Sequence, residues 1–192
     1  MILIVYSPDE RISNILLKKS VFRRNVVASL LLNIQAELKL AYKDFEDFGD
    51  NSATLDITPS FFEFASYNFE KEKDNFVLCR LHIGDVVSIN IGNENNFAII
   101  RAIFCHQTNG LRSAFVIVDW FEGLNRTRLG CPVYRLHTSN TTNQRRVFSI
   151  SLVNAINIAH FVHSCKDEEC IEGDHDTRND LYMRNLYFFK AV

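Results

Sequence analysis

Two histidines and two cysteines near the C-terminus have residue types and a spacing that could bind a metal ion. They are His163, Cys165, Cys170 and His175, in the pattern H-x-C-x4-C-x4-H. Side chains on a strand repeat their direction every two residues, so His163 and Cys165 would share one face. The polar segment that follows can bring Cys170 and His175 round to complete a tetrahedron. Two thiolates and two imidazoles suit Zn²⁺, and a closed set of four protein ligands is typical of a structural site.

The same residues allow two other interpretations. Cys165 would be a nucleophile if His163 or His175 activated it, or the four residues are unrelated and simply lie on a charged segment. Residues 166–180 hold seven acidic side chains against Lys166 and Arg178, and an acidic field raises the pKa of a thiol. The 7 glycines form no phosphate-binding loop or hydrolase motif. We therefore expect a structural zinc and no enzyme activity.

Composition limits the class of protein. The chain has 192 residues, is 47% hydrophobic with 16 Phe, and carries a net charge of −2. This favours one folded domain with an appendage over a disordered chain. No apolar run approaches the roughly 20 residues of a membrane span, and no secretory signal precedes the odd number of cysteines. We expect a soluble intracellular protein without disulfides and without a membrane partner.

Basic residues cluster in the second half of the chain, where arginines outnumber the acidic Asp119 and Glu122 between residues 101 and 146. The arginines there are Arg101, Arg112, Arg126, Arg128, Arg135, Arg145 and Arg146. Such a cluster is either a solvated surface or a site for phosphate groups. We keep nucleic-acid binding through Arg126, Arg128, Arg135, Arg145 and Arg146 as the alternative function.

The N-terminal part predicts a helix. Ser7 reads as an N-cap, Pro8 as the first helical residue and Glu10 as the carboxylate of a capping box. Apolar residues then recur every three or four positions, as in an amphipathic helix. They are Ile12, Leu16, Phe22, Val26, Leu30, Ile34, Leu38 and Ala41. We expect a helical extension over residues 1–52 that packs on itself, on the β domain or on another copy, which allows self-association through this helix.

From residue 58 onward the pattern is that of short strands. Val86–Ile91 alternates, and Thr108-Asn109-Gly110 between two apolar runs is a strong hairpin signal. About eight strands with short gaps predict a mainly β domain over residues 58–192, built as a small barrel or sandwich. The expected strands are 61–69, 76–79, 86–91, 97–104, 114–121, 147–149, 156–162 and 182–189.

The order of these strands resembles the bromo-adjacent homology (BAH) domain. The resemblance rests on Leu81 to Val87 with its Gly-Asp pair, on Ala98 to Ile103, on Val118-Asp119-Trp120-Phe121, and on Arg146 to Ser149. The stretch Ile156 to Cys165 and the aromatic run Tyr187 to Phe189 match later strands of that family. The resemblance covers roughly residues 58–192. It implies a non-enzymatic nuclear module that binds histone tails or other chromatin proteins.

Trp120 matches a tryptophan that lines a methyl-lysine cage in several members of the family, and Phe121 follows it. An indole face attracts an ammonium cation through a cation–π interaction. Glu122 replaces a second aromatic residue of the cage, and Ser88 is not aromatic either. The other interpretation of Trp120 is a core tryptophan. We take Trp120 and Phe121 as the candidate ligand-binding residues.

The C-terminal block with His163, Cys165, Cys170 and His175, followed by Tyr182-x2-Asn185, is similar to tails in fungal proteins derived from mobile elements. This resemblance implies a transposon-derived protein with a zinc-stapled BAH-like domain. The sequence thus predicts a chromatin-binding module, with nucleic-acid binding and helix-mediated self-association as its alternatives.

Overall fold

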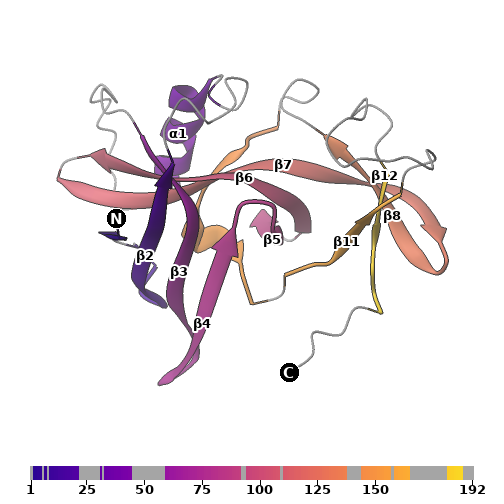
Figure 1. The fold of residues 1–192 in the computed structure, drawn as a ribbon, viewed down its shortest axis with the longest axis horizontal. Coiled ribbons are helices and arrows are strands. Elements are labelled where there is room, and N and C mark those ends of the chain that lie inside the picture. The colour runs from indigo at the N-terminus through magenta and orange to yellow at the C-terminus, as the bar shows by residue number, and fades with distance from the viewer. Residues whose placement is uncertain are drawn as a thin grey trace.

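The computed structural model describes residues 2–5, 7, 9–21, 31, 33–44, 59–91, 94–108, 110–137, 144–156, 158–164 and 181–187. Strands dominate these residues, which confirms the mainly β class (Figure 1). The strands are β1 (Ile2–Val5), β2 (Ile12–Val21), β3 (Ser60–Glu72), β4 (Asn75–His82), β5 (Val86–Ile91), β6 (Glu94–Thr108), β7 (Leu111–Arg128), β8 (Cys131–His137), β9 (Val147–Ser149), β10 (Val153–Asn154), β11 (Phe161–His163) and β12 (Leu181–Arg184). The helices are α1 (Ile34–Lys43) and the short 3₁₀ helix η3 (Ile150–Leu152).

The strands form one curled antiparallel sheet. Its main path runs β1-β2-β3-β6-β7-β8-β12-β11, with β4 beside β3, β9 beside β7, and β5 between β6 and β10. The long hairpin of β6 and β7 crosses the molecule and joins the part with β1 to β4 to the part with β8, β11 and β12 (Figure 1). Among the described residues β1 and β11 end the path without pairing with each other. The sheet of the described residues is therefore open, which does not support the barrel in the prediction of a barrel or sandwich.

The hairpin predicted at Thr108-Asn109-Gly110 is confirmed. Thr108 pairs with Leu111, and Gly110 has the positive φ of 79° that such a turn needs. A second tight turn after β7 escaped prediction. Leu129 and Gly130 both have positive φ there, 52° and 76°, and a leucine is an unusual residue in that conformation.

The predicted N-terminal helix is wrong over residues 12–21, which form strand β2. The register with β3 shifts between Ser13 and Leu16, and Asn14 has a φ of 54°. This bulge separates the buried Ile12 and Ile15 by three residues in place of two. The buried residues of this strand are therefore spaced three positions apart, as apolar residues on one face of a helix are. Because β2 pairs with β1 and β3, the described N-terminal strands belong to the sheet and form no helical extension.

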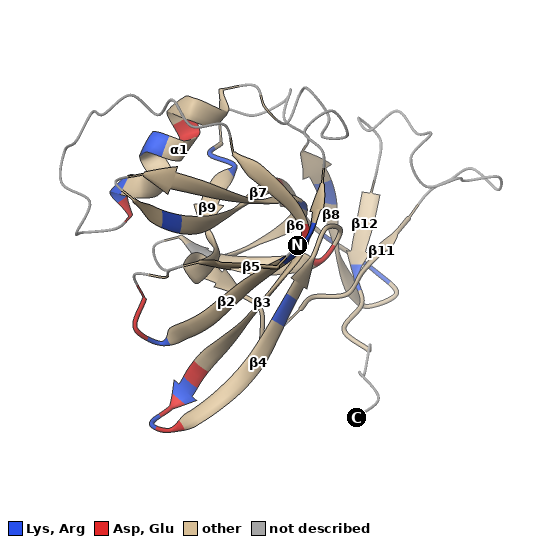
Figure 2. Ribbon diagram, turned by 60° about the vertical axis from the view of Figure 1, so that its left-hand side comes forward, with Lys and Arg blue, Asp and Glu red and all other residues tan. Residues whose placement is uncertain are grey.

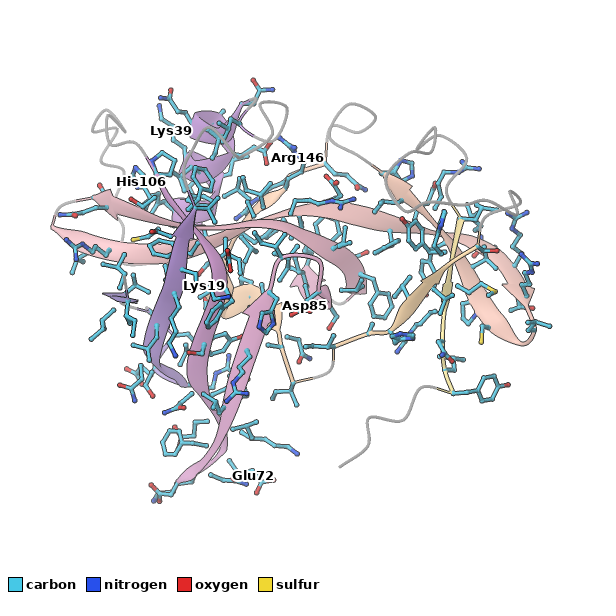
Figure 3. All side chains as sticks on the ribbon, in the orientation of Figure 1. Lys19, Lys39, Glu72, Asp85, His106 and Arg146 are labelled. Carbon is cyan, nitrogen blue, oxygen red and sulfur yellow. The ribbon has the colours of Figure 1, made fainter. Side chains whose placement is uncertain are left out.

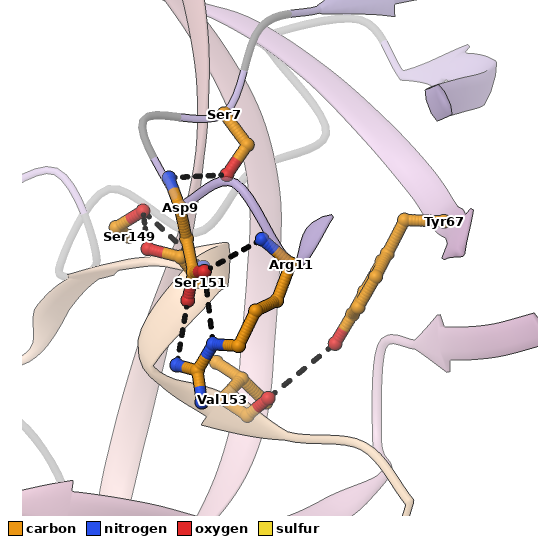
Figure 4. Close-up of polar contacts among 7 residues, drawn as sticks. All are labelled: Ser7, Asp9, Arg11, Tyr67, Ser149, Ser151 and Val153. Carbon is orange, nitrogen blue, oxygen red and sulfur yellow. Dashed lines mark hydrogen bonds and ion pairs between the residues drawn. The ribbon is translucent and has the colours of Figure 1, made fainter. Parts of the chain in front are cut away.

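The predicted capping box forms a turn between β1 and β2. Ser7 Oγ accepts a hydrogen bond from the Asp9 N–H at 3.2 Å, and Asp9 accepts from both the backbone and the guanidinium of Arg11 (Figure 4). The hydrogen bond from the Arg11 side chain lowers the pKa of Asp9, and this effect outweighs desolvation, which raises it. Short polar side chains cap turns by the same hydrogen bonds with which they cap helices, so the motif alone does not separate the two.

Only the last part of the predicted helix is helical among the described residues. Leu38, Ala41 and Tyr42 of α1 are buried, at the i, i+3 and i+4 spacing of one helix face. They pack against Phe104, Phe115, Ile117 and Val147 of β6, β7 and β9. The apolar side of α1 is thus covered by the sheet, which is one of the three packings expected for this part of the chain, and self-association stays a prediction.

The main core lies on the other side of β6 and β7, inside the curl of the sheet. It includes Ile15, Leu17, Phe62, Tyr67 and Ile103. The Tyr67 hydroxyl donates to the Val153 carbonyl at 3.4 Å and so ties β3 to β10 (Figure 4). A third, smaller cluster on β5, β7 and β8 contains Val86, Phe121 and Leu136.

Candidate functional site

A hollow of about 720 Å³ opens where the middle of β7 meets the end of β8 and the start of β9. This volume lies within the range of about 300–1,000 Å³ that is typical of ligand sites. Aromatic, acidic, basic and amide side chains all reach it. The hollow is lined by Ile91, Asn96, Trp120, Phe121, Glu122, Gly123, His137, Gln144, Arg145 and Phe148. We call it the Trp120 pocket.

Trp120 forms the inner wall of this pocket. Its indole is only 6% exposed, its Nε1–H donates to the Arg145 carbonyl at 2.7 Å, and its ring meets the edge of Phe148 at a centroid distance of 5.4 Å. A methyl-lysine cage needs ring faces that are free to surround the cation. Trp120 belongs to the core cluster and also lines the pocket, and its role in ligand binding stays a prediction.

Glu122 and His137 form the rim. Trp120 lies opposite His137 in the register of β7 and β8, and Glu122 lies opposite Arg135. The His137 Nε2 and Glu122 Oε2 atoms are 2.7 Å apart. The Glu122 side chain is 53% exposed, so a ligand can reach its carboxylate. Glu122, which stands where the family's cage has a second aromatic residue, is therefore an accessible acidic group of the pocket.

Arg145 is held in place by several contacts. Its guanidinium lies 4.4 Å over the Phe148 ring, donates to the Val147 carbonyl at 2.7 Å, and forms a two-pronged ion pair with Asp44. A guanidinium in such a fork is geometrically fixed, and its charge is offset by the carboxylate. Arg145 therefore serves as a wall of the pocket, and Glu122 supplies its most accessible charge.

A buried ion pair lies on β6 and β7 next to the pocket. Arg101 donates to Asp119 at 2.7 Å, and Asp119 is 4% exposed. The register of β6 shifts at Arg101, and a bulge of this kind re-aims a side chain. Burial raises the pKa of Asp119, although Arg101 and Arg146 act against this effect. The pair fixes the strand that carries Trp120.

Phe121 lies on the opposite face of β7 from Trp120. It stacks on Phe161 at 4.4 Å and meets Tyr134 and Tyr182 edge to face. The pocket therefore contacts only part of this residue, which is 7% exposed. The sequence prediction placed both aromatic residues in one site, and alternation along β7 sends them to different aromatic groups.

Of the four predicted zinc ligands, His163 lies within the described residues, and Cys165, Cys170 and His175 lie outside them. His163 ends β11, where its ring packs 5.1 Å from that of Tyr182 on β12. The two strands pair at His163 and Tyr182, and the Ser164 N–H donates to the Leu181 carbonyl. The described residues that flank segment 165–180, Ser164 and Leu181, thus lie side by side. Among the described residues alone, no cluster of three metal-binding side chains occurs.

The arginines of the alternative function fall into two groups. Arg145 and Arg146 bind acidic side chains of the α1 region, Asp44 and Glu37. Arg126, Arg128 and Arg135 are exposed on β7 and β8. Figure 2 shows that the positions of basic and acidic residues are interspersed along the described ribbon. The five arginines therefore do not form one patch.

The cysteines within the described residues are buried and free. Burial raises the pKa of the Cys105 thiol to about 11 and also raises that of Cys79. Thiols in such surroundings are poor nucleophiles. Sequence reasoning missed His137, Arg145 and Phe148 as pocket residues, although the alternating pattern of Val133 to His137 is a strand signal that marks the face on which His137 lies.

None of the described helices has the length and apolar character required to cross a lipid bilayer. Comparison of the chain with protein-family models, with curated proteins and with solved structures finds no match.

Proposed function

We propose that the chain is a non-enzymatic nuclear binding module that docks a lysine- or arginine-rich peptide segment, such as a histone tail, in the Trp120 pocket. The observation that carries this proposal is the half-exposed Glu122 carboxylate at the rim of an aromatic-walled hollow of about 720 Å³. A basic side chain can place its stem against Trp120 and Phe148 and its charge at Glu122.

The charge around the pocket supports a cationic ligand. Arg145 is engaged by Asp44, so it opposes a cation less than a free arginine would. Seven acidic residues lie between Lys166 and Asp180. Leu181, the first described residue after this segment, lies opposite Arg135, two residues along β8 from His137. Acidic groups close to a binding site speed the encounter with basic partners and exclude acidic ones.

The same proposal includes a structural zinc held by His163, Cys165, Cys170 and His175. Its support is the composition of the four residues and the pairing of β11 with β12, the described strands on either side of the segment. A metal staple would fix the acidic segment relative to β8 and hence relative to the pocket.

Peptide binding tests the proposal directly. Fluorescence anisotropy of a labelled, lysine-rich histone-tail peptide is measured with the full chain, with Glu122→Gln, and with the matched variant Glu72→Gln. Glu72 lies at the tip of the β3–β4 hairpin, away from the pocket (Figure 3). We expect Glu122→Gln to weaken binding about three- to ten-fold, which is the range for a partly exposed charged contact, and Glu72→Gln to leave binding unchanged.

Two further ligands separate the alternatives. A peptide with its lysines trimethylated should bind no more tightly than the unmodified peptide, because Trp120 is only 6% exposed and Glu122 stands where the cage would need a second aromatic residue. Duplex DNA should bind weakly. If duplex DNA binds, is released by 200 mM salt, and depends on Arg126, Arg128 and Arg135, the nucleic-acid alternative replaces the peptide proposal.

A further inference from the structure

A second group of side chains with recognisable chemistry lies on the β2–β4 part of the sheet, separate from the Trp120 pocket. Lys18 pairs with Phe64 across β2 and β3, and Phe64 pairs with His82 across β3 and β4. The three residues therefore form one row across three strands. Figure 3 shows the neighbouring Lys19 on this part of the molecule, away from Arg146.

The half-buried Phe64 ring is the centre of the row. The Lys18 and Lys19 ammonium groups lie 5.7 and 5.9 Å from the ring centroid. The His82 ring lies 5.5 Å away at an interplanar angle of 30°. The Lys19 ammonium also pairs with the Glu63 carboxylate at 3.2 Å, so Lys18 supplies the positive charge that Glu63 does not offset. A π surface with lysines beside it can take a ligand that has both a flat aromatic face and negative charge.

A hollow of about 320 Å³ adjoins the Phe64 ring. It is lined by Lys19, Glu63, Phe64, His82 and Ile83. Lys19, Glu63 and His82 are each more than half exposed, and Ile83 is 45% exposed. The hollow is thus open to solvent, with aromatic and aliphatic walls and a lysine at its mouth.

From this arrangement we propose that the Lys18–Phe64–His82 row binds single-stranded nucleic acid, with one base stacked on Phe64 and His82 and the adjoining phosphates at Lys18 and Lys19. Aromatic side chains on a sheet, next to basic residues, hold single strands by stacking and by phosphate contacts. An acidic peptide would use the lysines but not the two rings, whereas a nucleotide base also stacks on the rings. The site is independent of the peptide pocket proposed above.

The test uses the full chain and fluorescence anisotropy of a labelled 12-nucleotide single strand, as DNA and as RNA, at 50 and 200 mM salt. Phe64→Leu removes the stacking surface and keeps an apolar side chain, and Phe64→Trp restores an aromatic ring. Lys18→Gln combined with Lys19→Gln removes the phosphate contacts. Lys71→Gln combined with Lys73→Gln is the matched control, because both lysines are exposed at the β3–β4 turn. Circular dichroism establishes that each variant is folded.

We expect Phe64→Leu to weaken binding about five-fold or more, since one stacked base contributes about 1–3 kcal/mol, and Phe64→Trp to bind at least as tightly as the parent. The Lys18/Lys19 double variant should reduce the salt slope by about 1.4, at about 0.7 per phosphate contact on a single strand. The Lys71/Lys73 control and Glu122→Gln should change neither the affinity for the single strand nor the salt slope.

Three results would overturn the proposal: no binding of either strand at 50 mM salt, equal affinity of the parent and a folded Phe64→Leu variant, or equal binding of duplex and single strand. Binding of a polyglutamate peptide that is as tight as that of the oligonucleotide and equally sensitive to Phe64→Leu would assign the row to acidic peptides instead. A peptide-binding defect confined to Glu122→Gln would not bear on this proposal. The peptide proposal and the nucleic-acid proposal can therefore be contradicted separately.

Discussion

Glu37 on α1 and Arg146 at the start of β9 join the helix to the sheet. The Glu37 carboxylate accepts from the backbone N–H of Arg146 at 2.7 Å, from the backbone N–H of Val147 at 3.1 Å, and from the Arg146 guanidinium at 3.3 Å. Both side chains are largely buried, at 15% and 7% exposure. A carboxylate thus satisfies two backbone donors where the chain enters β9, directly beside the Arg145 wall of the Trp120 pocket.

Replacement of Glu37 by Ala should therefore destabilise the protein by about 2–4 kcal/mol, because two backbone donors and a buried guanidinium lose a charged acceptor. Urea unfolding followed by circular dichroism measures the change in the free energy of unfolding. Lys39→Ala, at an exposed position of the same helix, should change it by no more than about 0.5 kcal/mol. Equal effects of the two substitutions would contradict the structural role of Glu37.

Local patterns predicted most of the strands but not the contacts that shape the site. The alternation of Val86–Ile91 and the Asn-Gly turn at 109–110 depend on neighbouring residues, so the sequence predicts them well. A bulge at Asn14 concealed the alternation of β2. The contact of Glu37 with Arg146 spans 109 residues, and no local pattern indicates which distant residue a carboxylate will meet.

For the candidate site, too, the sequence indicated single residues but not the distant contacts that shape the pocket. Trp120 was identified through the order of its neighbouring residues, and the structure places it in the wall of a pocket. The role of Glu122 depends on His137, which lies 15 residues away on a strand that was not predicted. The wall formed by Arg145 depends on Asp44, 101 residues away. Arginine clustering along the sequence could not show that two of the five arginines are bound by acidic side chains.

Trp120 provides a direct probe of its pocket because the chain contains 1 Trp. A bound basic peptide would change the surroundings of the indole, so we expect a saturable change in tryptophan emission with the same midpoint as the anisotropy titration. Single-stranded nucleic acid at Phe64 should leave this emission unchanged. A tryptophan response to the oligonucleotide, lost in Glu122→Gln, would show that both ligands enter the Trp120 pocket.

His106 should make stability depend on pH. It is 2% exposed and its Nδ1 lies 2.8 Å from the Tyr42 hydroxyl, while its buried Nε2 has no hydrogen-bond partner among the described residues. Burial lowers the pKa of His106 in the fold, so the unfolded chain takes up a proton first as the pH falls. The neutral histidine therefore supports the fold above its ordinary pKa of about 6.5, and this contribution is lost as the pH falls toward the lower folded value.

Between pH 7 and pH 5 we expect the free energy of unfolding to fall by up to about 1.4 kcal/mol per pH unit from this residue. His106→Gln keeps a side chain that can bond to Tyr42 and does not titrate, so its stability should vary less over that range. His82→Gln, at an exposed position, controls for the loss of a histidine elsewhere. If the free energy of unfolding of His106→Gln depends on pH as strongly as that of the parent, His106 is not the source of this dependence.

Metal content tests the remaining part of the proposed site. Elemental analysis of the purified chain should give one zinc per chain, and the combined Cys165→Ser and Cys170→Ser variant should have none, because two of four ligands are lost. Loss of the metal should also lower the thermal midpoint and weaken binding of the basic peptide, since the acidic segment would no longer be fixed beside β8. The matched control is Cys131→Ser, a buried cysteine outside the set, which should keep its zinc. A metal-free parent, or a metal-free variant with the parent's thermal midpoint and peptide affinity, would reduce the four residues to unrelated positions on a charged segment.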